Sequence, residues 1–500
     1  MGRLEKEFDM ASRREFFRHS AGAIATAALA GGTTAQAETR SNPASPPVDE
    51  PDDYAAKLHA ARKAIGVTGA SFAYWDGKML HSAASGLRNS VTRDPVTTDT
   101  LMHLGSITKV MNATLLMQLV DEGRITLDDP ILKHLPDLRL GDMQSAARIT
   151  CRMLVNHTSG IDGAWLPEYG PDQERIVDTI DRCAALGQLF SPGAETSYNN
   201  VATVIAGYLV QKVRERSWYW LTKEKIYDPL DMHHALVDPL DAPRFRVSVG
   251  DLTDSASGKL VQTTRAFLAT SLAPAGSTQM ASAIDVVTFA RALINDGIGP
   301  NGKRIVSARS ARAMATPTAA FAPIGAWADQ VGLGWMIQPG GVLSHGGSGP
   351  GVRSKLYAHP PSGRVIALLT NSDNGDQLIE TFMDPIMQSW TGIRPVEPPV
   401  DDRPVDLAPY LGIYEDIADR YRIDRDGGGL ALRTADKFLT YDNSSDDKPP
   451  IFLDPIGNDT FRTRANTPPA DQRTIRFLRP RPDGKMQFVS SWGKLMARSG

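Results

Sequence analysis

The sequence predicts an α+β protein of two domains, a large one that combines helices with an antiparallel sheet and a small all-β one. The chain has 500 residues, more than a single hydrophobic core usually organises. Strand-like runs stand near both ends of residues 54–393 with helical segments between them, so the elements do not alternate as in a parallel α/β fold. A proline-rich stretch, residues 394–406, reads as a linker to a strand-rich tail, residues 407–500.

The first half of the large domain predicts a helix, a hairpin and a second helix. The opening helical stretch ends at Gly66, because glycine commonly follows the last residue of a helix. Two strand-like runs then flank Asp76-Gly77, a signal for a tight hairpin. Apolar residues recur at helical spacing over residues 107–120, and Gly123 follows, which predicts a helix with one apolar face.

The second half predicts a multi-stranded antiparallel sheet. Residues 284–297 have the clearest amphipathic helical pattern. Short β-rich runs with turns between them follow, and a helical run that would pack on the sheet comes last. The strand candidates are residues 331–338, 341–347, 354–360 and 364–372, and the helix is residues 379–390. The tail, residues 407–500, has strand-like runs broken by glycine-rich turns, which predicts a small barrel or sandwich.

The N-terminus resembles a twin-arginine export signal. Arg13 and Arg14 precede an apolar run, Ala21–Ala30, and a small-x-small site that predicts cleavage after Ala37. Residues 1–37 would then be the signal and residues 38–53 a flexible tether, and we expect a periplasmic or secreted protein. The apolar run is too short for a lasting membrane span, and the alternative is a basic, disordered tail.

Composition narrows the function classes. The formal net charge is −3 and no basic run occurs, which argues against nucleic acid as a partner. The two cysteines, Cys151 and Cys183, have no metal-binding spacing, and we interpret them as free, buried thiols, with a disulfide as the alternative. The cysteines therefore indicate no metal site. The sequence leaves the oligomeric state open.

A serine and a lysine one helical turn apart form the first candidate catalytic element. Ser106 and Lys109 would lie on one face at the start of an apolar helix, where free backbone N–H groups favour negative charge. A neutral lysine there is able to take the serine proton. The same spacing recurs at Ser445–Lys448 and at Ser491–Lys494, but neither of these opens an apolar helix.

Two further elements supply possible partners. Tyr198 and Asn200 are two residues apart, so in an extended loop both side chains point the same way. A tyrosine whose pKa is lowered by an ammonium is a workable base, and an asparagine binds an amide. His345 ends a strand before Gly346 and Gly347, which leave room for a substrate backbone, and the N–H of Ser348 is a candidate oxyanion donor.

In this order and at these separations, the elements resemble the motifs Ser-x-x-Lys, Tyr-x-Asn and Lys/His-x-Gly of the penicillin-recognising serine hydrolases. That family includes class C β-lactamases, D,D-carboxypeptidases, D-aminopeptidases and related esterases. The resemblance covers about residues 54–390 and includes the segments LMHLGSITKV, CRMLVNHTSG and FSPGAETSYNN. It implies a β-lactamase/transpeptidase-like domain, with helices on both sides of an antiparallel sheet and an all-helical lobe. The tail is similar to the lipocalin-like barrels that follow such domains in some D-aminopeptidase chains.

The resemblance also implies roles for the site residues. Ser106 would be acylated, and Lys109 and Tyr198 would share its deprotonation and protonate the leaving group. Asn200 would bind the substrate amide beside His345 and Gly347, and the N–H groups of Ser106 and Ser348 would form the oxyanion hole. His157 lies in a segment that is structural in the family. The resemblance also implies that no metal or cofactor is needed, and that the substrate is a small molecule or a short peptide.

Substrate class stays open between several alternatives. His345 stands where class C β-lactamases have a lysine, which weakens the positive charge for a β-lactam carboxylate and disfavours that activity. We expect a peptidase or amidase acting on a small or unusual peptide, with an esterase on the same scaffold as the alternative. A non-catalytic binding or sensor protein is a further alternative, although every expected side chain is present.

Overall fold

The structure is a computed structural model that describes residues 53–163, 175–254, 257–321, 328–393, 399–401, 403–437, 449–464, 467 and 472–499. The predicted signal and all of the predicted tether except Asp53 lie outside the described residues. The tetrad Ser445–Lys448 and part of the predicted linker, residues 394–398 and 402, lie outside them too.

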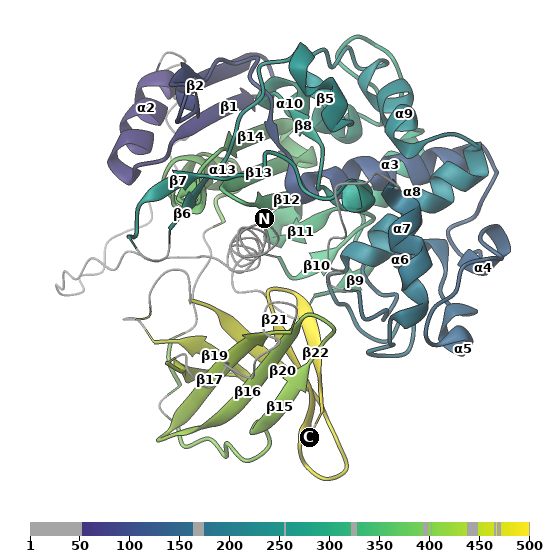
Figure 1. The fold of residues 1–500 in the computed structure, drawn as a ribbon, viewed down its shortest axis with the longest axis vertical. Helices are drawn as coiled ribbons and strands as arrows, with labels where there is room; N and C mark the ends of the chain where they lie inside the picture. The colour runs from purple at the N-terminus through teal and green to yellow at the C-terminus, as the bar shows by residue number, and fades with distance from the viewer. Residues whose placement is uncertain are drawn as a thin grey trace, which may run out of the picture.

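A nine-stranded antiparallel sheet organises the large domain (Figure 1). Its two halves come from opposite ends of the domain, because the N-terminal hairpin joins the C-terminal strands where β1 pairs with β14. The order across the sheet is β3 (Asp94–Pro95), β2 (Leu80–Asn89), β1 (Gly69–Trp75), β14 (Arg364–Thr370), β13 (Val352–His359), β12 (Val342–Gly349), β11 (Met336–Gln338), β10 (Gln330–Val331) and β9 (Ala319–Ala320). The single strand expected over residues 331–338 is divided in two, because Gly334 takes a positive φ of 81° and the chain turns there.

Helices cover both faces of this sheet, as the sequence predicted. One face packs against α2 (Tyr54–Ile65), α12 (Gly375–Leu378), the π-helical turn η8 (Ile379–Met383) and α13 (Asp384–Thr391), through a core that contains Phe72 and Phe382. The other face packs against α10 (Ala283–Ile294), which contacts β1, β13 and β14. Beyond α10 lies a mostly helical lobe, seen at the right of Figure 1.

The remaining elements of the large domain build this lobe and its edges. The helices are α3 (Thr108–Asp121), α4 (Ile131–His134), α5 (Met143–Ala146), α6 (Cys151–Val155), α7 (Arg175–Arg182), α8 (Asn200–Arg214), α9 (Trp218–Thr222) and α11 (Ala308–Met314). Two small sheets complete it, one of β4 (Met102–His103), β8 (Met280–Ala281) and β5 (Ala235–Leu236), and one of β6 (Asp251–Thr253) and β7 (Leu260–Gln262).

The central helix α3 differs from its expected form. We expected one apolar face, but every residue from Thr108 to Leu119 is buried, because helices α8, α9 and α11 surround it. Its polar side chains are satisfied internally, as where Asn112 Nδ2 donates to the carbonyl oxygen of Thr203 at 2.9 Å. A helix buried on all sides is a rigid support for whatever its N-terminus carries.

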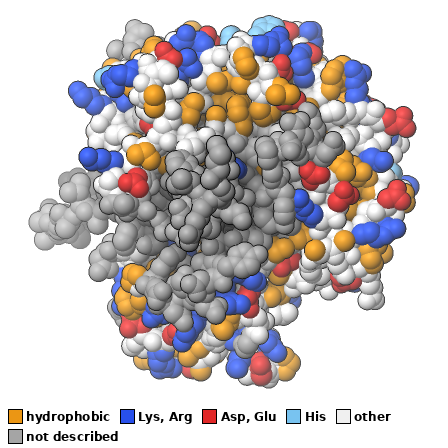
Figure 2. Space-filling model, in the orientation of Figure 1, with side chains coloured by type: hydrophobic (Ala, Val, Ile, Leu, Met, Phe, Trp, Pro, Cys, Tyr) orange, Lys and Arg blue, Asp and Glu red, His pale blue; other side chains and the backbone are white. Residues whose placement is uncertain are grey.

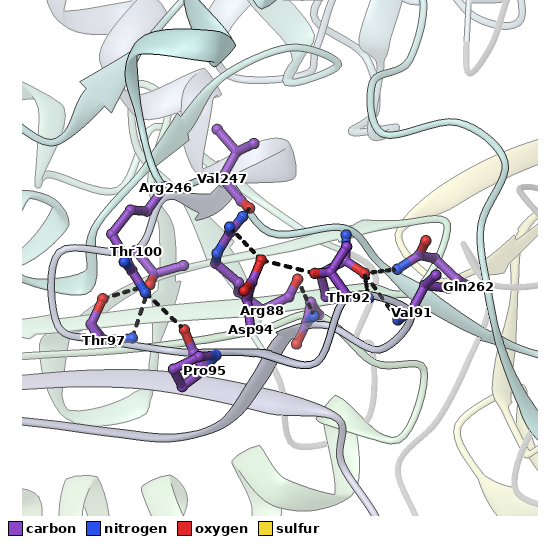
Figure 3. Close-up of polar contacts among 12 residues, drawn as sticks. Arg88, Val91, Thr92, Asp94, Pro95, Thr97, Thr100, Arg246, Val247 and Gln262 are labelled. Carbon is purple, nitrogen blue, oxygen red and sulfur yellow. Dashed lines mark hydrogen bonds and ion pairs between the residues drawn. The ribbon is translucent and has the colours of Figure 1, made fainter.

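A polar network fixes the edge of the sheet at β2 and β3 (Figure 3). Arg88 donates to the carbonyl oxygen of Val247 at 2.8 Å and to Asp94 at 2.7 Å, so one guanidinium joins β2, β3 and the segment before β6. Arg246 reaches the carbonyl oxygen of Pro95 at 3.3 Å. These bonds hold the two-residue edge strand β3 in place beside β2.

The C-terminal strands close into an antiparallel barrel with its own apolar core, which contains Tyr414, Phe461 and Phe477. The sequence predicted this small all-β unit, and closure occurs where β15 pairs with β22. Its strands are β15 (Gly412–Glu415), β16 (Asp419–Asp426), β17 (Gly429–Asp436), β18 (Ile451–Gly457), β19 (Thr460–Thr463), β20 (Thr474–Pro480), β21 (Met486–Ser491) and β22 (Lys494–Arg498).

Basic and acidic side chains are interspersed over the face shown in Figure 2. Among the residues that the structure describes, no helix is long and apolar enough to cross a membrane.

Candidate active site

Ser106 lies in a 3₁₀ turn, η1 (Gly105–Ile107), directly before α3. Gly105 has a φ of 51°, and a Cβ placed on it would lie 2.8 Å from the backbone nitrogen of Ser348 and from the Cα of Gly347. Only glycine therefore lets strand β12 pass this close to the turn. The backbone of Ser348 is thus brought beside Ser106, as the oxyanion-hole prediction requires.

Lys109 lies next to Ser106 in the first turn of α3. Its side chain is only 2% exposed, and its Nζ is 3.1 Å from Ser106 Oγ and donates to the carbonyl oxygen of Ala275 at 2.8 Å. Burial lowers the pKa of Lys109 well below its ordinary value, and the nearby charge of Lys494 lowers it further. Burial therefore favours the neutral amine, whose lone pair is able to take the serine proton.

Tyr198 faces the same two side chains, but its electrostatics differ from our expectation. Lys109 Nζ lies 4.8 Å from the centre of the Tyr198 ring. We expected an ammonium to lower the pKa of this phenol, whereas burial raises it, and a hydrogen bond with Ser106 offsets only part of that rise. The expectation was wrong because the phenol itself is desolvated, and burial disfavours its charged form. The raised pKa favours the protonated phenol of Tyr198.

His157 supports the tyrosine and is structural, as expected. Its Nδ1 accepts the backbone N–H of Asn199 at 3.2 Å, and its carbonyl oxygen accepts the N–H of Ser197 at 2.9 Å. Its ring centre lies 4.7 Å from that of Tyr198. Desolvation lowers the pKa of His157 well below its ordinary value, so burial favours the neutral form of the ring that lies beside Tyr198.

Asn200 occupies the first turn of α8, whereas we expected an extended loop. The preceding residue, Asn199, caps the helix by accepting the N–H of Ala202 at 2.8 Å, and its Nδ2 donates to the carbonyl oxygen of Ile161 at 2.6 Å. The capping interaction explains why the helix begins at Asn200, with its cap directly after the tyrosine.

The third motif lies on β12, beside η1. His345 is 2% exposed, and its Nδ1 is 2.7 Å from the carbonyl oxygen of Gly346. Burial lowers the pKa of His345 to about 3, so the ring is neutral at physiological pH. Its Nε2 is buried and has no hydrogen-bond partner among the described residues. Gly347 packs against the carbonyl oxygen of Leu104, and the side chain of Ser348 is exposed.

The barrel contributes residues that the sequence analysis did not place in the site. The Tyr198 N–H donates to the carbonyl oxygen of Gly493 at 2.8 Å, and the Leu495 N–H donates to Ser197 Oγ at 3.0 Å. These bonds bring the β21–β22 turn to the catalytic segment. The one sequence signal there was the tetrad Ser491–Lys494, which we had set aside as a chance repeat of the Ser-x-x-Lys spacing.

Metal and thiol chemistry find no support in the described part of the chain. No group of three or more His, Cys, Asp or Glu side chains there is arranged to hold a metal ion. Cys151 and Cys183 are free and buried, as we expected, and burial raises the pKa of each thiol to about 12. Neither thiol is therefore a nucleophile at neutral pH.

Comparison with known proteins agrees with this geometry. The Beta-lactamase family model matches residues 54–381. Penicillin-binding protein 4 of Amycolatopsis lactamdurans is 33% identical over 370 residues, which cover 72% of this chain and 96% of the relative. Esterase EstB of Burkholderia gladioli is 30% identical over 191 residues, which cover 35% of this chain and 48% of the esterase.

The barrel is included in the structural similarity. The crystal structure of SurE superposes with a TM-score of 0.73 and 25% sequence identity, covering 89% of this chain and 98% of SurE. A second structure, SurE with D-Leu, gives a TM-score of 0.70 at 26% identity, again covering 89% of this chain.

Proposed function

Because the chain belongs to the β-lactamase family, we propose that it is a serine hydrolase that cleaves an amide bond of a small or unusual peptide through an acyl-enzyme on Ser106. One observation carries the proposal, namely the 3.1 Å approach of the buried Lys109 Nζ to Ser106 Oγ. Desolvation makes that amine a base, and the neighbouring phenol of Tyr198 a donor, so one site holds a nucleophile and both proton carriers.

Acylation then follows from the positions of these groups. Ser106 Oγ attacks the substrate carbonyl carbon while its proton passes to Lys109 Nζ, and the carbonyl oxygen becomes an oxyanion. The backbone N–H groups of Ser106 and Ser348 would hold that oxyanion. Collapse breaks the carbon–nitrogen bond, and the leaving amine takes a proton from Tyr198, which recovers it from Lys109.

Deacylation reverses the same proton route. Water attacks the acyl-enzyme carbonyl, Lys109 accepts its proton through Tyr198, and the proton returns to Ser106 Oγ as the acid leaves. His345 is neutral and would offer its Nε2 as an acceptor to a substrate N–H. Asn200 offers both a donor and an acceptor to the substrate amide.

Amide cleavage is favoured over ester cleavage because an amine leaves only when it is protonated, and the site has a donor for that step. The presence of D-Leu in one SurE structure supports an amino-acid-derived substrate. The similarity to esterase EstB favours the alternative, an esterase with the same acyl-enzyme. The neutral His345 provides no cation at the position where class C β-lactamases have a lysine, which disfavours action on β-lactams.

The test uses one acyl group presented both as a peptide amide and as the matching ester. We expect the chain without residues 1–37 to cleave both, and Ser106→Ala to cleave neither. Turnover of the ester alone would replace the peptidase proposal with the esterase. Failure of a fluorophosphonate probe to label Ser106 would instead indicate a non-catalytic binding protein.

We also propose export to the periplasm or beyond, supported by the paired arginines Arg13 and Arg14 and the small-residue site at Ala35–Ala37. The full chain expressed in a host with a twin-arginine system should lose its first 37 residues, whereas the double variant Arg13→Lys/Arg14→Lys should remain uncut in the cytoplasm. An uncut, cytoplasmic wild type would contradict the proposal.

A further inference from the structure

The turn that joins β21 to β22 is conformationally unusual. Trp492 and Gly493 form a two-residue turn, with φ values of 54° and 73°. Such turns favour Asn-Gly, because both central residues take a positive φ, and a bulky aromatic residue in the first position is strained. Strain of about 1–3 kcal/mol persists only where the surroundings hold it, and it concentrates at functional sites.

The surroundings that hold this turn are those of the catalytic tyrosine. The turn and Ser197–Tyr198 share two hydrogen bonds, Tyr198 N–H to the Gly493 oxygen and Leu495 N–H to Ser197 Oγ. The Trp492 ring packs in a cluster with Tyr198, Phe321 and Met336. Leu495 packs against Phe190 of the large domain. The turn is therefore seated on the segment that positions Tyr198.

Lys494 stands between these fixed points. Its side chain is half-buried, and among the described residues it forms no ion pair or hydrogen bond. Its charge nevertheless lowers the pKa of Lys109 and that of Asp416, so the ammonium lies close enough to influence both. Strand alternation places Lys494 on the face of Met496, which packs in the barrel core, and so at the barrel end nearest Tyr198.

Lys494 is thus a lysine without an ion pair among the described residues, and the acidic group that its charge reaches, Asp416, also has Asp419 and Asp162 as charged neighbours. His345 is uncharged at pH 7, and burial lowers the pKa of Lys109 well below its ordinary value. Asp416, the acidic group whose pKa the charge of Lys494 lowers, is only 2% exposed, and burial raises its pKa to about 7. A half-buried ammonium in a low-dielectric site favours an anion brought by the substrate.

We propose that Lys494 binds a carboxylate of the substrate, so that the barrel provides a specificity-determining residue for the hydrolase site. This inference rests on the proposed function and narrows it to peptides or esters that carry a free carboxylate near the scissile bond. The turn limits where the lysine is able to lie, since Trp492 packs against the same apolar cluster as Tyr198.

Matched substrates test the proposal. Each is made with a carboxylate and with the corresponding neutral carboxamide, once in the acyl half and once in the leaving half, and each as amide and as ester. We expect the wild type to prefer one carboxylate form in kcat/KM, and Lys494→Met to reduce that preference about 10-fold, with Lys494→Arg retaining most of it. Comparison of the substrates with the carboxylate in the acyl half and in the leaving half shows which of the two carboxylates is bound. The preference should weaken as ionic strength rises.

The ratio of kcat/KM between the carboxylate and carboxamide substrates separates recognition of the carboxylate from changes that affect both reactions equally. Loss of the Lys494 charge raises the pKa of Lys109 in every reaction, and this change cancels between the carboxylate and carboxamide forms. Lys485→Met, an exposed lysine at the far end of β21, is the matched control and should leave the preference intact. An equal loss on both forms, or lower stability alone, would show that Lys494 serves only to offset Asp416, and would overturn the inference.

Failure of the proposed function gives a different result. If only esters turn over, the ratio of kcat/KM between the carboxylate ester and the carboxamide ester still measures the preference. If no substrate turns over, titration of Ser106→Ala with the carboxylate and carboxamide peptides measures the same preference as a ratio of Kd values. No preference in either format would exclude the Lys494 subsite.

Discussion

The two described Ser-x-x-Lys tetrads have the same spacing and different chemistry. Ser106 and Lys109 stand at the start of a helix buried on all sides, and desolvation lowers the pKa of the lysine well below its ordinary value. Ser491 and Lys494 face each other across a hairpin, where the lysine is half-buried and Ser491 accepts a hydrogen bond from the Tyr421 hydroxyl at 3.2 Å. The spacing fixes proximity, but burial decides whether a lysine is a base or a cation.

Both tetrads nevertheless meet at one tyrosine. The side chain of Tyr198 faces Ser106 and Lys109, while its backbone N–H binds the turn that carries Lys494. The large domain therefore supplies the reacting groups, and the barrel supplies a charge beside them. Because the two contributions come through different atoms of Tyr198, substitutions are able to separate them.

The largest expected effect comes from replacing the serine of each tetrad by alanine in turn. Ser106→Ala should lower kcat by at least about 10³-fold, because it removes the nucleophile. Ser491→Ala should change kcat by no more than a few-fold, since it removes only the contact with Tyr421. Steady-state turnover of an ester substrate measures both. Comparable losses in the two variants would contradict the separation of a catalytic tetrad from a binding one.

Tyr198→Phe sharpens the comparison by removing the side-chain role and keeping the backbone bond to Gly493. We expect a loss of about 10²–10⁴-fold on a peptide amide, which depends on a proton donor for the leaving amine. The loss on the matching ester should be smaller, because an alkoxide leaves more easily than an amide ion. Thermal unfolding should show that the barrel still docks. An equal loss on both substrates would mean that Tyr198 acts on the serine and not on the leaving group.

These two regions also show what sequence reasoning is able to find. The hairpin around Asp76-Gly77, the helix over 284–297 and the later strands follow from local patterns, because turn residues and apolar periodicity report on nearest neighbours. Ser106, Lys109, Tyr198 and His345 were selected as candidates because three short motifs occur in the family's order. The structure brings these residues together around Ser106.

The failures share a physical cause, which is dependence on distant parts of the chain. The all-round burial of α3 results from helices that begin at Asn200 or later in the chain, and the sequence pattern of α3 itself shows only one apolar face. The raised pKa of Tyr198 comes from desolvation by several segments. Lys494 lies 296 residues after Tyr198, and no local pattern relates the two. A tetrad dismissed as a coincidence therefore reached the site through tertiary contact.

Acid stability distinguishes the desolvated surroundings of the first tetrad from those of the second. The pKa of His345 is about 3 in the folded chain and 6.5 when unfolded, so the unfolded state binds the extra proton between these values. Stability should therefore fall as pH drops from 6.5 towards 3, by up to about 1.4 kcal/mol per pH unit from this residue. Above pH 6.5 the group contributes no pH dependence.

His345→Asn removes the titratable imidazole but keeps a side-chain N–H donor for the carbonyl oxygen of Gly346. Urea unfolding at pH 7 and at pH 4.5 should show a smaller acid-induced loss of stability for the variant than for the wild type. An identical pH slope for His345→Asn and the wild type would mean that the His345 ring is hydrated.

The smallest expected effect lies in the contact that joins the two regions. Ser197→Ala removes the acceptor for the Leu495 N–H, leaves that buried donor unpaired, and should cost about 1 kcal/mol of unfolding free energy. Turnover should change little, because the Tyr198 N–H still binds Gly493. Ser191→Ala is the matched control, since Ser191 is exposed in the same loop. Equal stability of the two variants would show that Trp492 packing and the Tyr198–Gly493 bond alone hold the barrel turn against the catalytic segment.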